Sequence, residues 1–533
     1  MGGIAIGPLR YFKKRDIAIN RNSSTSPEEE WRRFLFACEE AKQKISELYE
    51  KALAEVGEEN ASIFEIHQML LEDDDFTTSV KNMIYNQKAT AEYATSSIGD
   101  QFSDMFAKME DSYMQARAAD VLDISHRITG ILTENHETSQ RSETPFILVA
   151  KDLSPSETIQ LDKDLVLGFV IHNGSTNSHT AILARTMGIP ALTGVDVEED
   201  WDGYLGAIDG YNQCVYINPS ADVLSDMEQK QRCDLQQKTL LQELRGQRSE
   251  TLDGRRINIY ANIGSVEDSK LAIENDAEGI GLFRSEFLYL DSKDFPSEEQ
   301  QFLTYKKVVE NMQGKKVIIR TLDIGADKQV SYFGLNKEEN PALGYRAIRI
   351  CLTHKEIFKT QLRAILRASA FGSVSIMFPM VISIQEVHQA KEILDECRRE
   401  LQLQGKDIGD IEVGIMIETP AAVMIADDLA KEVDFFSLGT NDLTQYTLAI
   451  DRQNQMLERF YDTHHPAILK MIRHVVEAGH RNGCWVGICG ELGADHTLTR
   501  EFLLMGVDEL SVSPTETLSL RKLIRSMDLG KTQ

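Results

Sequence analysis

The segment VGIMIETPAAVMIADDLAKEVDFFSLGTND (Val413–Asp442) holds two short apolar runs with a stretch of helical periodicity between them. Glu418 ends the first run, and Asp442 follows the second. Short apolar runs bounded by polar residues are typical of strands that are buried on both faces, as in parallel sheets. The order of strand, helix and strand therefore predicts a parallel βα unit with an acidic residue after each strand.

Runs of this kind occur eight times in the second half of the chain, and helical stretches separate most of them. They are Ile257–Asn262, Gly279–Arg284, Val317–Asp323, Val374–Met380, Val413–Glu418, Phe435–Asp442, Trp485–Glu491 and Glu509–Ser513. Eight strands that alternate with helices predict a closed parallel (β/α)8 TIM barrel over residues 251–533. Because the active site of such a barrel lies at the carboxyl ends of its strands, the residues that end each run are the first candidates for chemistry.

Glu418 and Asp442 are two of the acidic residues that end these runs. Glu418 and Asp442 belong to consecutive predicted strands, so the barrel would hold their carboxylates side by side. Two carboxylates together with substrate oxygens are ligands that Mg²⁺ typically accepts. Asn441 and Glu491 lie at the same predicted strand ends. This pattern predicts a divalent-metal site at the mouth of the barrel.

Basic residues and a cysteine lie at these strand ends or in adjoining loops. They are Arg284, Arg320, Arg346, Arg452 and Cys489. The planar guanidinium groups could clamp phosphate and carboxylate oxygens, and the thiol, with an ordinary pKa of about 8.5, could donate a proton. Taken singly, each arginine could equally form a surface ion pair, and the cysteine could fill a small apolar space. Together with the two acidic residues they predict a site for a phosphorylated carboxylic acid held with a divalent metal.

The first half of the chain has a different organisation. Residues 26–136 show helical periodicity, whereas residues 146–219 contain short strand-like runs that Ile4–Phe12 could join. We therefore expect a multidomain α/β protein. Residues 1–22 and 140–220 would form an α/β domain, residues 23–139 a helical bundle inserted into it, and residues 221–250 a linker helix before the barrel.

The sharpest local signal in this half is NGSTNSHTAILARTMGIPALTG (Asn173–Gly194). Small residues precede His179, and Thr180–Met187 is expected to form a helix that Gly188 and Pro190 end. His179 would then lie at a helix N-terminus, where free N–H groups and the helix dipole stabilise a phosphate on the ring. The dipole also favours the neutral, nucleophilic imidazole. A single histidine in this place could equally be a capping or buried residue.

Composition and charge exclude several classes of protein. The 533 residues are 42% hydrophobic and 26% charged, as in an ordinary globular protein, and no apolar stretch is long enough for a membrane span. No signal peptide is expected in MGGIAIGPLRYFKKRD. The net charge of −27 argues against nucleic-acid binding and permits docking of a basic protein. Seven dispersed cysteines without a CxxC pair suit a reducing cytoplasm.

Several stretches carry residue patterns that go beyond periodicity. They are SHTAILAR (Ser178–Arg185), GIGLFRSEFLYLD (Gly279–Asp291), RTLDIGADK (Arg320–Lys328), ENPALGYRAIRI (Glu339–Ile350), GIMIETPAA (Gly414–Ala422), FFSLGTNDLTQYTLAIDR (Phe435–Arg452) and ICGELG (Ile488–Gly493). Together they resemble enzyme I of the bacterial phosphotransferase system, the phosphoenolpyruvate–protein phosphotransferases. The resemblance runs over nearly the whole chain, and the NDLTQY block is highly specific.

The resemblance implies an activity and a set of site residues. Such an enzyme transfers the phosphoryl group of phosphoenolpyruvate to His179, releases pyruvate, and phosphorylates a histidine of the small carrier protein HPr in the first step of sugar uptake. Glu418 and Asp442 would bind Mg²⁺, and Cys489 would protonate enolpyruvate. Thr158 would be a supporting hydroxyl near His179. The implied substrate-binding positions are Arg284, Arg320, Arg346, Asn441 and Arg452.

The resemblance also implies partners. The helical insertion would dock HPr through a surface that includes FEIHQMLLEDDDF (Phe64–Phe76). The candidate contact residues are His67, Met69, Leu70, Asp73, Asp75, Tyr113 and Arg117. The family is dimeric through its barrel, so a homodimer is expected. Its association should be weakened here, because the chain stops before the final helical segment that usually follows.

The sequence departs from the family pattern and leaves rival functions open. Ser175–Asn177 replaces the usual Gly-Arg-Thr, and the residues that usually precede GIAIG are missing. Pyruvate phosphate dikinase and phosphoenolpyruvate synthase share the histidine domain and the barrel, but no stretch remains here for their nucleotide-binding domain. A non-catalytic relative that only docks HPr is the rival from another class, and the altered loop keeps it open.

Overall fold

The structure, a computed structural model, describes residues 2–13, 19–22, 25–56, 58–109, 112–133, 144–162, 165–173, 184, 189–290, 292, 294–325, 330–336, 338–452 and 454–530. The chain divides into two compact units, Met1–Lys238 and Thr239–Gln533. None of the helices in these ranges is both long and apolar enough to cross a membrane. The prediction of a multidomain α/β protein with an eight-stranded parallel barrel is confirmed.

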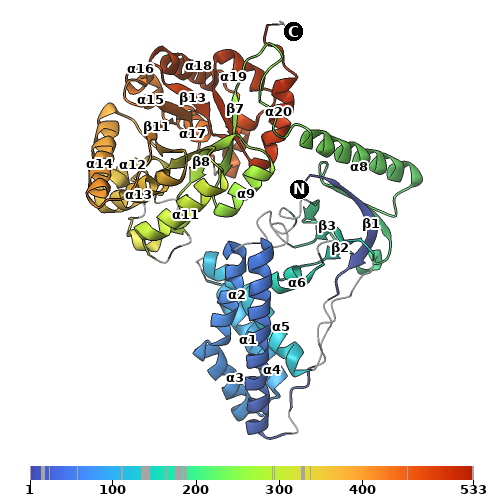
Figure 1. The fold of residues 1–533 in the computed structure, drawn as a ribbon. Coiled ribbons are helices and arrows are strands. Elements are labelled where there is room, and N and C mark those ends of the chain that lie inside the picture. Colours follow the sequence, from blue (N-terminus) through green and yellow to red (C-terminus); the bar gives the residue numbers. More distant parts are fainter. Residues whose placement is uncertain are drawn as a thin grey trace. The chain divides into compact units, whose positions relative to one another are not determined.

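The first unit contains the predicted group of helices. They are α1 (Pro27–Val56), α2 (Glu58–Leu71), α3 (Asp74–Gln87), α4 (Ala91–Ala107) and α5 (Ser112–Leu132). Figure 1 shows them lying side by side as a bundle. Each helix presents one apolar stripe to a shared core, which includes the buried side chains of Phe34, Phe64, Phe76 and Ile128. The remaining faces are left to solvent.

A six-stranded sheet forms the other part of the first unit. It contains β1 (Ile4–Tyr11), β2 (Phe146–Ala150), β3 (Val166–Ile171), β4 (Ala191–Thr193), β5 (Leu205–Asp209) and β6 (Cys214–Ile217), in the order β4-β3-β2-β1-β5-β6. The opening residues join this sheet as expected, because β1 pairs parallel to β2 and antiparallel to β5. Two short helices, α6 (Pro155–Gln160) and the 3-10 helix η1 (Glu199–Trp201), lie in its connections. Strand β4 was not predicted, since three residues are too few to show an alternating pattern.

The predicted linker helix is present as α8 (Ala221–Gln242). Met227 is buried against Ile4 and Ala207 of the sheet. Leu235 and Leu240 lie further along the helix and are 66% and 50% exposed. The apolar spacing that predicted the helix therefore marks a buried stripe only near its start.

The second unit is the predicted barrel. Its strands are β7 (Asn258–Ile263), β8 (Gly279–Arg284), β9 (Lys316–Arg320), β10 (Val374–Phe378), β11 (Ile411–Ile417), β12 (Phe435–Leu438), β13 (Trp485–Ile488) and β14 (Glu509–Val512). Each strand pairs in parallel with the next along the chain, and β14 pairs with β7 to close the barrel. All eight strand ends therefore meet at one mouth.

Helices surround these strands on the outside, as Figure 1 shows. They are α9 (Val266–Glu274), α10 (Phe287–Leu290), α11 (Glu298–Asn311), α12 (Ile348–Thr353), α13 (Lys355–Ala368), α14 (Ile384–Leu403), α15 (Pro420–Met424), α16 (Ala426–Leu429), α17 (Thr440–Leu448), α18 (Pro466–Arg481), α19 (Thr499–Met505) and α20 (Thr517–Arg525). The large core lies between strands and helices. A smaller cluster, which includes Met377, Met416, Phe435 and Cys489, lies apart from that core. One buried member comes from each of β7 to β12, and Cys489 follows β13, so the cluster fills the barrel interior.

Candidate active site

The predicted metal ligands follow neighbouring strands. Glu418 comes directly after β11, and Asp442 lies in the first turn of α17 after β12, which pairs with β11 in register. Both side chains are buried. Oε1 of Glu418 accepts a hydrogen bond from the backbone N–H of Met380 at 2.6 Å. Met380 has a left-handed backbone with φ of 57°, an uncommon conformation for a non-glycine residue that aims its N–H at the carboxylate.

The second oxygen of Glu418 is buried and has no hydrogen-bond partner among the described residues. Burial, followed by the charges of Asp442 and Asp323, raises the pKa of the Glu418 carboxyl to about 8. The charges of Arg320 and Arg346 lower this pKa but do not offset the effects of burial and the two acidic neighbours. The pair of carboxylates therefore fits a hard divalent cation, which favours oxygen ligands.

Two of the predicted substrate-binding arginines are buried and share one acidic partner. Arg320, at the end of β9, lies 3.0 Å from Asp323, and Arg346 donates to the other Asp323 oxygen at 2.8 Å. Arg320 also donates to Glu286. Arg346 reaches toward the acidic side of the mouth, where its Nη1 lies 3.8 Å from an oxygen of Asp442. The structure thus brings both arginines to the same mouth as the two acidic residues.

The other predicted substrate-binding residues lie nearer the rim. Arg452 is partly exposed, and its Nη2 is 3.9 Å from Asp442. Asn441 exchanges hydrogen bonds with Glu491, because its Nδ2 donates to the Glu491 carboxylate and its Oδ1 accepts from the Glu491 N–H, each at 3.1 Å. Arg284 ends β8 with an exposed side chain. Exposed arginines at a rim can turn toward an anion as it enters.

Cys489 follows β13 and is buried inside the barrel mouth. Its sulfur lies 3.6 Å from the carbonyl oxygen of Leu438, and its own carbonyl accepts from Asn262 at 3.0 Å. Burial raises the pKa of the thiol to about 12. The group is therefore a protonated thiol at neutral pH, which suits a proton donor and not a thiolate nucleophile.

The histidine signal lies outside the described residues. His179 and most of the predicted helix Thr180–Met187 fall there, so its place at a helix N-terminus remains a prediction. Thr158 is buried in α6, and its hydroxyl donates to the Ser154 carbonyl at 2.7 Å. His172 follows β3, and its ring nitrogen Nδ1 lies 3.1 Å from the Val195 carbonyl.

The candidate partner-binding residues divide into exposed and buried groups. Met69 is 60% exposed, and Asp73 and Asp75 are exposed at the start of α3. His67 is fully buried beside Asp120 and Asp123. Helices cover the His67 ring in this structure, so its role in partner binding remains a prediction.

The remaining two candidates lie on α5. Arg117 pairs with Asp120 at 2.8 Å, and the side chain of Tyr113 lies outside the described residues.

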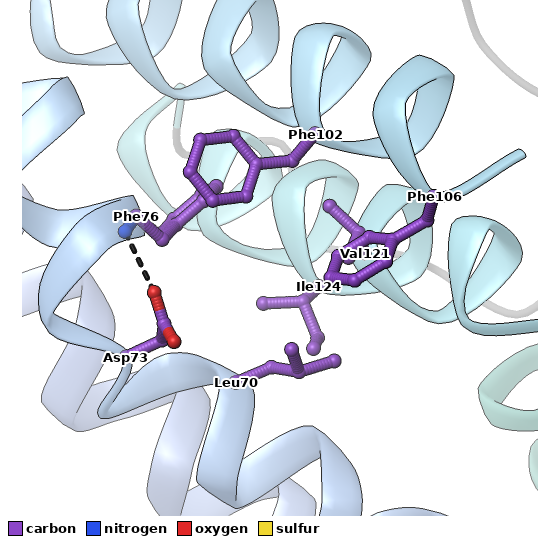
Figure 2. A pocket seen from close by; sticks show the side chains of 7 residues that line it. All are labelled: Leu70, Asp73, Phe76, Phe102, Phe106, Val121 and Ile124. Atoms are coloured by element: carbon purple, nitrogen blue, oxygen red, sulfur yellow. Dashed lines mark hydrogen bonds between the residues drawn. The ribbon is translucent and has the colours of Figure 1, made fainter. Parts of the chain in front are cut away.

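A small cavity opens beside the exposed residue Asp73. Its lining residues are Leu70, Asp73, Phe76, Phe102, Phe106, Val121 and Ile124. Figure 2 shows the apolar side chains converging from neighbouring helices, with Asp73 bonded to the Phe76 N–H at the edge. Its volume of about 30 Å³ is enough for a water molecule or a methyl group. The cavity can therefore accept the tip of a side chain and is too small for a cofactor.

Three site residues escaped the sequence analysis. Asp323 and Glu286 hold Arg320, and the Tyr446 hydroxyl accepts from Arg346 at 3.4 Å. Asp323 ends one of the eight apolar runs, and Glu286 follows Arg284 by two residues, so their positions after strands were a usable signal. Tyr446 lies inside a helix, where nothing in the spacing distinguishes it from a packing residue.

Comparisons with known proteins agree with this geometry. Three family models match consecutive stretches: the PEP-utilising enzyme, N-terminal family at residues 1–117, the PEP-utilising enzyme, mobile domain family at 142–213, and the PEP-utilising enzyme, PEP-binding domain family at 238–529. The last of these covers the whole barrel. A phosphoenolpyruvate-protein phosphotransferase of Staphylococcus carnosus (strain TM300) is 42% identical over 530 residues, which span 99% of this chain and 92% of that protein.

The chain belongs to the phosphoenolpyruvate-protein phosphotransferase family. Two further members show the same extent of similarity. The protein of Bacillus subtilis (strain 168) is 42% identical over 98% of this chain and 93% of its own length. The protein of Haemophilus influenzae (strain ATCC 51907 / DSM 11121 / KW20 / Rd) is 42% identical over 99% of this chain and 92% of its own. The resemblance seen in the sequence motifs is therefore confirmed.

Proposed function

We propose that this chain is a Mg²⁺-dependent phosphoenolpyruvate–protein phosphotransferase. It would phosphorylate itself on His179 and then phosphorylate a histidine of HPr, in the first step of sugar uptake by the phosphotransferase system. The observation that carries the proposal is the barrel mouth, where Glu418 and Asp442 lie at neighbouring strand ends close to the buried arginines Arg320 and Arg346. In a chain with a net charge of −27, such a local concentration of arginines marks the place for an anionic substrate.

The metal would be held by two protein ligands. Glu418 offers a buried carboxylate oxygen that has no hydrogen-bond partner in the described part of the chain, and Asp442 lies beside it. Among the described residues no group of three or more histidine, cysteine or acidic side chains could hold a metal alone. The remaining ligands would therefore be substrate and water oxygens. When bound, Mg²⁺ would draw negative charge from the phosphoryl oxygens.

The arginines would neutralise the rest of the substrate's charge. Asp323 fixes Arg320 and Arg346 before the substrate arrives, since each of its oxygens contacts one of them. Preset positive groups stabilise a transferring phosphoryl group without reorganisation during the reaction. Arg284 and Arg452 would add contacts from the rim, and Asn441 would fix the substrate's orientation.

The bond changes follow from these placements. A ring nitrogen of His179 attacks phosphorus in line, and an N–P bond forms while the P–O bond to enolpyruvate breaks. The Cys489 thiol gives its proton to the methylene carbon of the enolate, which becomes the methyl group of pyruvate. The raised pKa of Cys489 keeps that proton available at neutral pH. Thr158 would support the histidine.

The two sites belong to different parts of the chain. His179 lies in the sequence of the first unit, whereas the barrel mouth is in the second. The histidine must therefore approach the mouth to receive the phosphoryl group and leave it to meet HPr, a domain movement with α8 near the hinge.

HPr would dock on the helical bundle. The exposed side chains of Met69, Asp73 and Asp75, with Leu70 at the edge of the small cavity, offer an apolar contact flanked by negative charge. Such a surface suits a partner with an apolar side chain surrounded by basic residues. Arg117 and Tyr113 would extend it, and His67 would support it from inside.

We also propose a cytoplasmic homodimer that associates through the barrel. All seven cysteines are free, which suits a reducing compartment. The dimer rests on the family resemblance. Sedimentation over a range of concentrations, with Mg²⁺ and phosphoenolpyruvate present, should show a concentration-dependent dimer; a monomer at every concentration would contradict it.

The proposed activity is tested by combining the chain with Mg²⁺, phosphoenolpyruvate and HPr. Pyruvate and phosphorylated HPr should appear in equal amounts, and a His179→Ala variant should form neither. A protein that only docks HPr would bind the carrier without forming pyruvate. That result from the wild-type chain would contradict the proposal.

A further inference from the structure

The Tyr446 hydroxyl at the barrel mouth contacts both Arg346 and Ala342. Tyr446 lies in α17, one helical turn after Asp442. Its oxygen accepts a hydrogen bond from Nη1 of Arg346 at 3.4 Å and donates to the carbonyl oxygen of Ala342 at 2.5 Å. The sulfur of Met380 lies 3.9 Å away, too far for more than a weak contact. The side chain thus joins the helix of one metal ligand to the segment that carries a substrate-binding arginine.

The directions of these hydrogen bonds decide what the phenol can do. A phenol has one proton to donate, and Ala342 takes it. Its lone pairs are then left to accept from the guanidinium, which has only donors. Burial raises the pKa of Tyr446 to about 12, so the group stays neutral and keeps this arrangement at physiological pH. The phenol therefore orients Arg346 without adding a negative charge that would compete with an anionic substrate.

The Arg346 guanidinium needs a neutral hydrogen-bond acceptor to fix its orientation. Its Nη2 is held by Asp323 at 2.8 Å, while its Nη1 points toward Asp442 at 3.8 Å without forming a close ion pair. Without Tyr446, Nη1 would have no close neutral acceptor among these contacts and could swing toward the Asp442 carboxylate. The residue after Arg346 supports this reading, because Ala347 has a strained backbone with φ of 53° and ψ of −126° at a buried position.

We propose that Tyr446 is a positioning residue that holds Arg346 in the orientation required to bind the phosphate of phosphoenolpyruvate. The inference rests on the proposed function, since it assigns Arg346 to that substrate. This role differs from packing, because it depends on the hydroxyl oxygen of Tyr446 and not on its ring.

The Tyr446→Phe variant isolates the oxygen, because phenylalanine fills nearly the same space. Its KM for phosphoenolpyruvate should rise about 3- to 10-fold, the effect of losing one long hydrogen bond to a charged group. The Mg²⁺ concentration for half-maximal activity, measured at saturating substrate, should stay unchanged. Tyr289→Phe is the matched control, since that buried hydroxyl donates to Gln301 and not to a predicted substrate-binding residue, so its loss should leave KM unaltered.

A double-mutant cycle with Arg346→Lys separates positioning from packing. If the phenol acts through the guanidinium, Tyr446→Phe should raise KM far less in the Arg346→Lys background than in the wild type. Equal effects in both backgrounds, a KM within about twofold of the wild type, or a shift in Mg²⁺ dependence alone would each overturn the proposal.

Calorimetric binding of phosphoenolpyruvate with Mg²⁺ keeps this test independent of the proposed function. If the wild-type chain binds phosphoenolpyruvate but transfers no phosphate, the proposed function fails while the effect of Tyr446→Phe on affinity is still measured. If transfer is intact and the variant binds as tightly as the wild type, only the role of Tyr446 is wrong.

Discussion

Among the single residues of the site, Asp323 is the one that holds both buried arginines in place. Its oxygens contact Arg320 and Arg346 at 3.0 and 2.8 Å, and all three side chains are buried. Burying charges costs several kcal/mol for each ion unless the geometry of the pair is good. The arginines therefore keep their orientation without substrate, at a cost to stability that a binding role explains.

The Glu418 carboxyl should make the metal-free protein sensitive to pH. Its pKa is raised to about 8, so between its ordinary range and pH 8 the folded chain holds a proton that the unfolded chain has lost. The contribution of this carboxyl to the free energy of unfolding is fully present at low pH and is lost as the pH rises through its pKa in the folded state. A Glu418→Gln variant cannot ionise, and at pH 8 without metal it should melt about 2–4 °C above the wild type, with no difference near pH 5.

Calorimetry with and without Mg²⁺ checks this prediction. The metal should raise the melting temperature of the wild type at pH 8 and leave that of Glu418→Gln unchanged. Glu412→Gln is the matched control on the same strand, because Glu412 pairs with Lys316 and is partly exposed. A Glu418→Gln protein that Mg²⁺ stabilises as well as the wild type would contradict the metal assignment.

Replacing Cys489 by alanine should reduce pyruvate formation by about 10²- to 10⁴-fold, because the enolate loses its proton donor. Cys484→Ala is the control, since Cys484 is also buried, with a pKa raised to about 12, but lies before the start of β13. Because the pKa of Cys489 is also raised to about 12, thiol ionisation should cause no loss of wild-type activity between pH 7 and 10. Unaltered activity in Cys489→Ala would exclude the thiol as the acid.

Residues that end strands could be predicted from the sequence, and those that work through other side chains could not. Glu418 and Cys489 follow apolar runs that lead to one barrel mouth, so spacing alone brings them together. Tyr446 has its role because of a loop about a hundred residues earlier, at Ala342 and Arg346. His67 shows the reverse case, since nearby residues such as Met69 and Asp73 are exposed while helix packing buries its ring.

At the scale of elements, Arg521 of α20 fixes the end of the linker to the barrel. This fully buried side chain donates to Ser249 and to the Leu244 carbonyl, each at 3.1 Å, and to the Asp276 carbonyl at 2.7 Å. Asp276 also accepts from the Gly246 N–H at 2.7 Å. The chain that leaves α8 is therefore bound to the barrel from about residue 244 onward.

An Arg521→Met variant should destabilise the barrel by about 3–5 kcal/mol, because it removes the charged partner of the partly buried Asp276 carboxylate and a donor to two carbonyls. Urea unfolding of the full chain, followed by circular dichroism, measures the loss. Arg525→Met is the control: that side chain also reaches the linker, at the Arg248 carbonyl, but it is more exposed. Its expected cost is below about 1 kcal/mol, and an equal cost for both variants would show that Arg521 has no special anchoring role.

Element order was largely predictable, because each barrel strand is a short apolar run of adequate length. The elements that the sequence did not predict are short. Strand β4 has only three residues, and α15 and α16 are helices of five and four residues. Lengths of this size are shorter than the windows in which helical or alternating patterns become visible.

At the scale of the whole molecule, the chain separates into a unit that contains the histidine motif and a unit that contains the barrel. The first unit has its own cores in the bundle and around the sheet, and α8 packs on that sheet through Met227. The barrel has a core of its own. The exact domain boundaries remain a prediction.

A fragment that ends near Gly246 should therefore retain one of the two phosphate transfers. It contains His179 and the bundle, so it should exchange phosphate with phosphorylated HPr, since transfer between histidines needs only close approach. It lacks the barrel, so it should not react with phosphoenolpyruvate. Circular dichroism must first show that the fragment is folded. Acceptance of phosphate from phosphoenolpyruvate, or a folded fragment that cannot take it from phosphorylated HPr, would contradict this division.

The central claim is that the barrel mouth delivers a phosphoryl group to His179. The most direct test is to incubate the whole chain with Mg²⁺ and phosphoenolpyruvate labelled in its phosphate, and to map the label by mass spectrometry. The account predicts an acid-labile, base-stable label on His179 that requires Mg²⁺ and is absent from Glu418→Gln. A label on another residue, a label that forms equally in Glu418→Gln, or no label on a chain that binds phosphoenolpyruvate would contradict it.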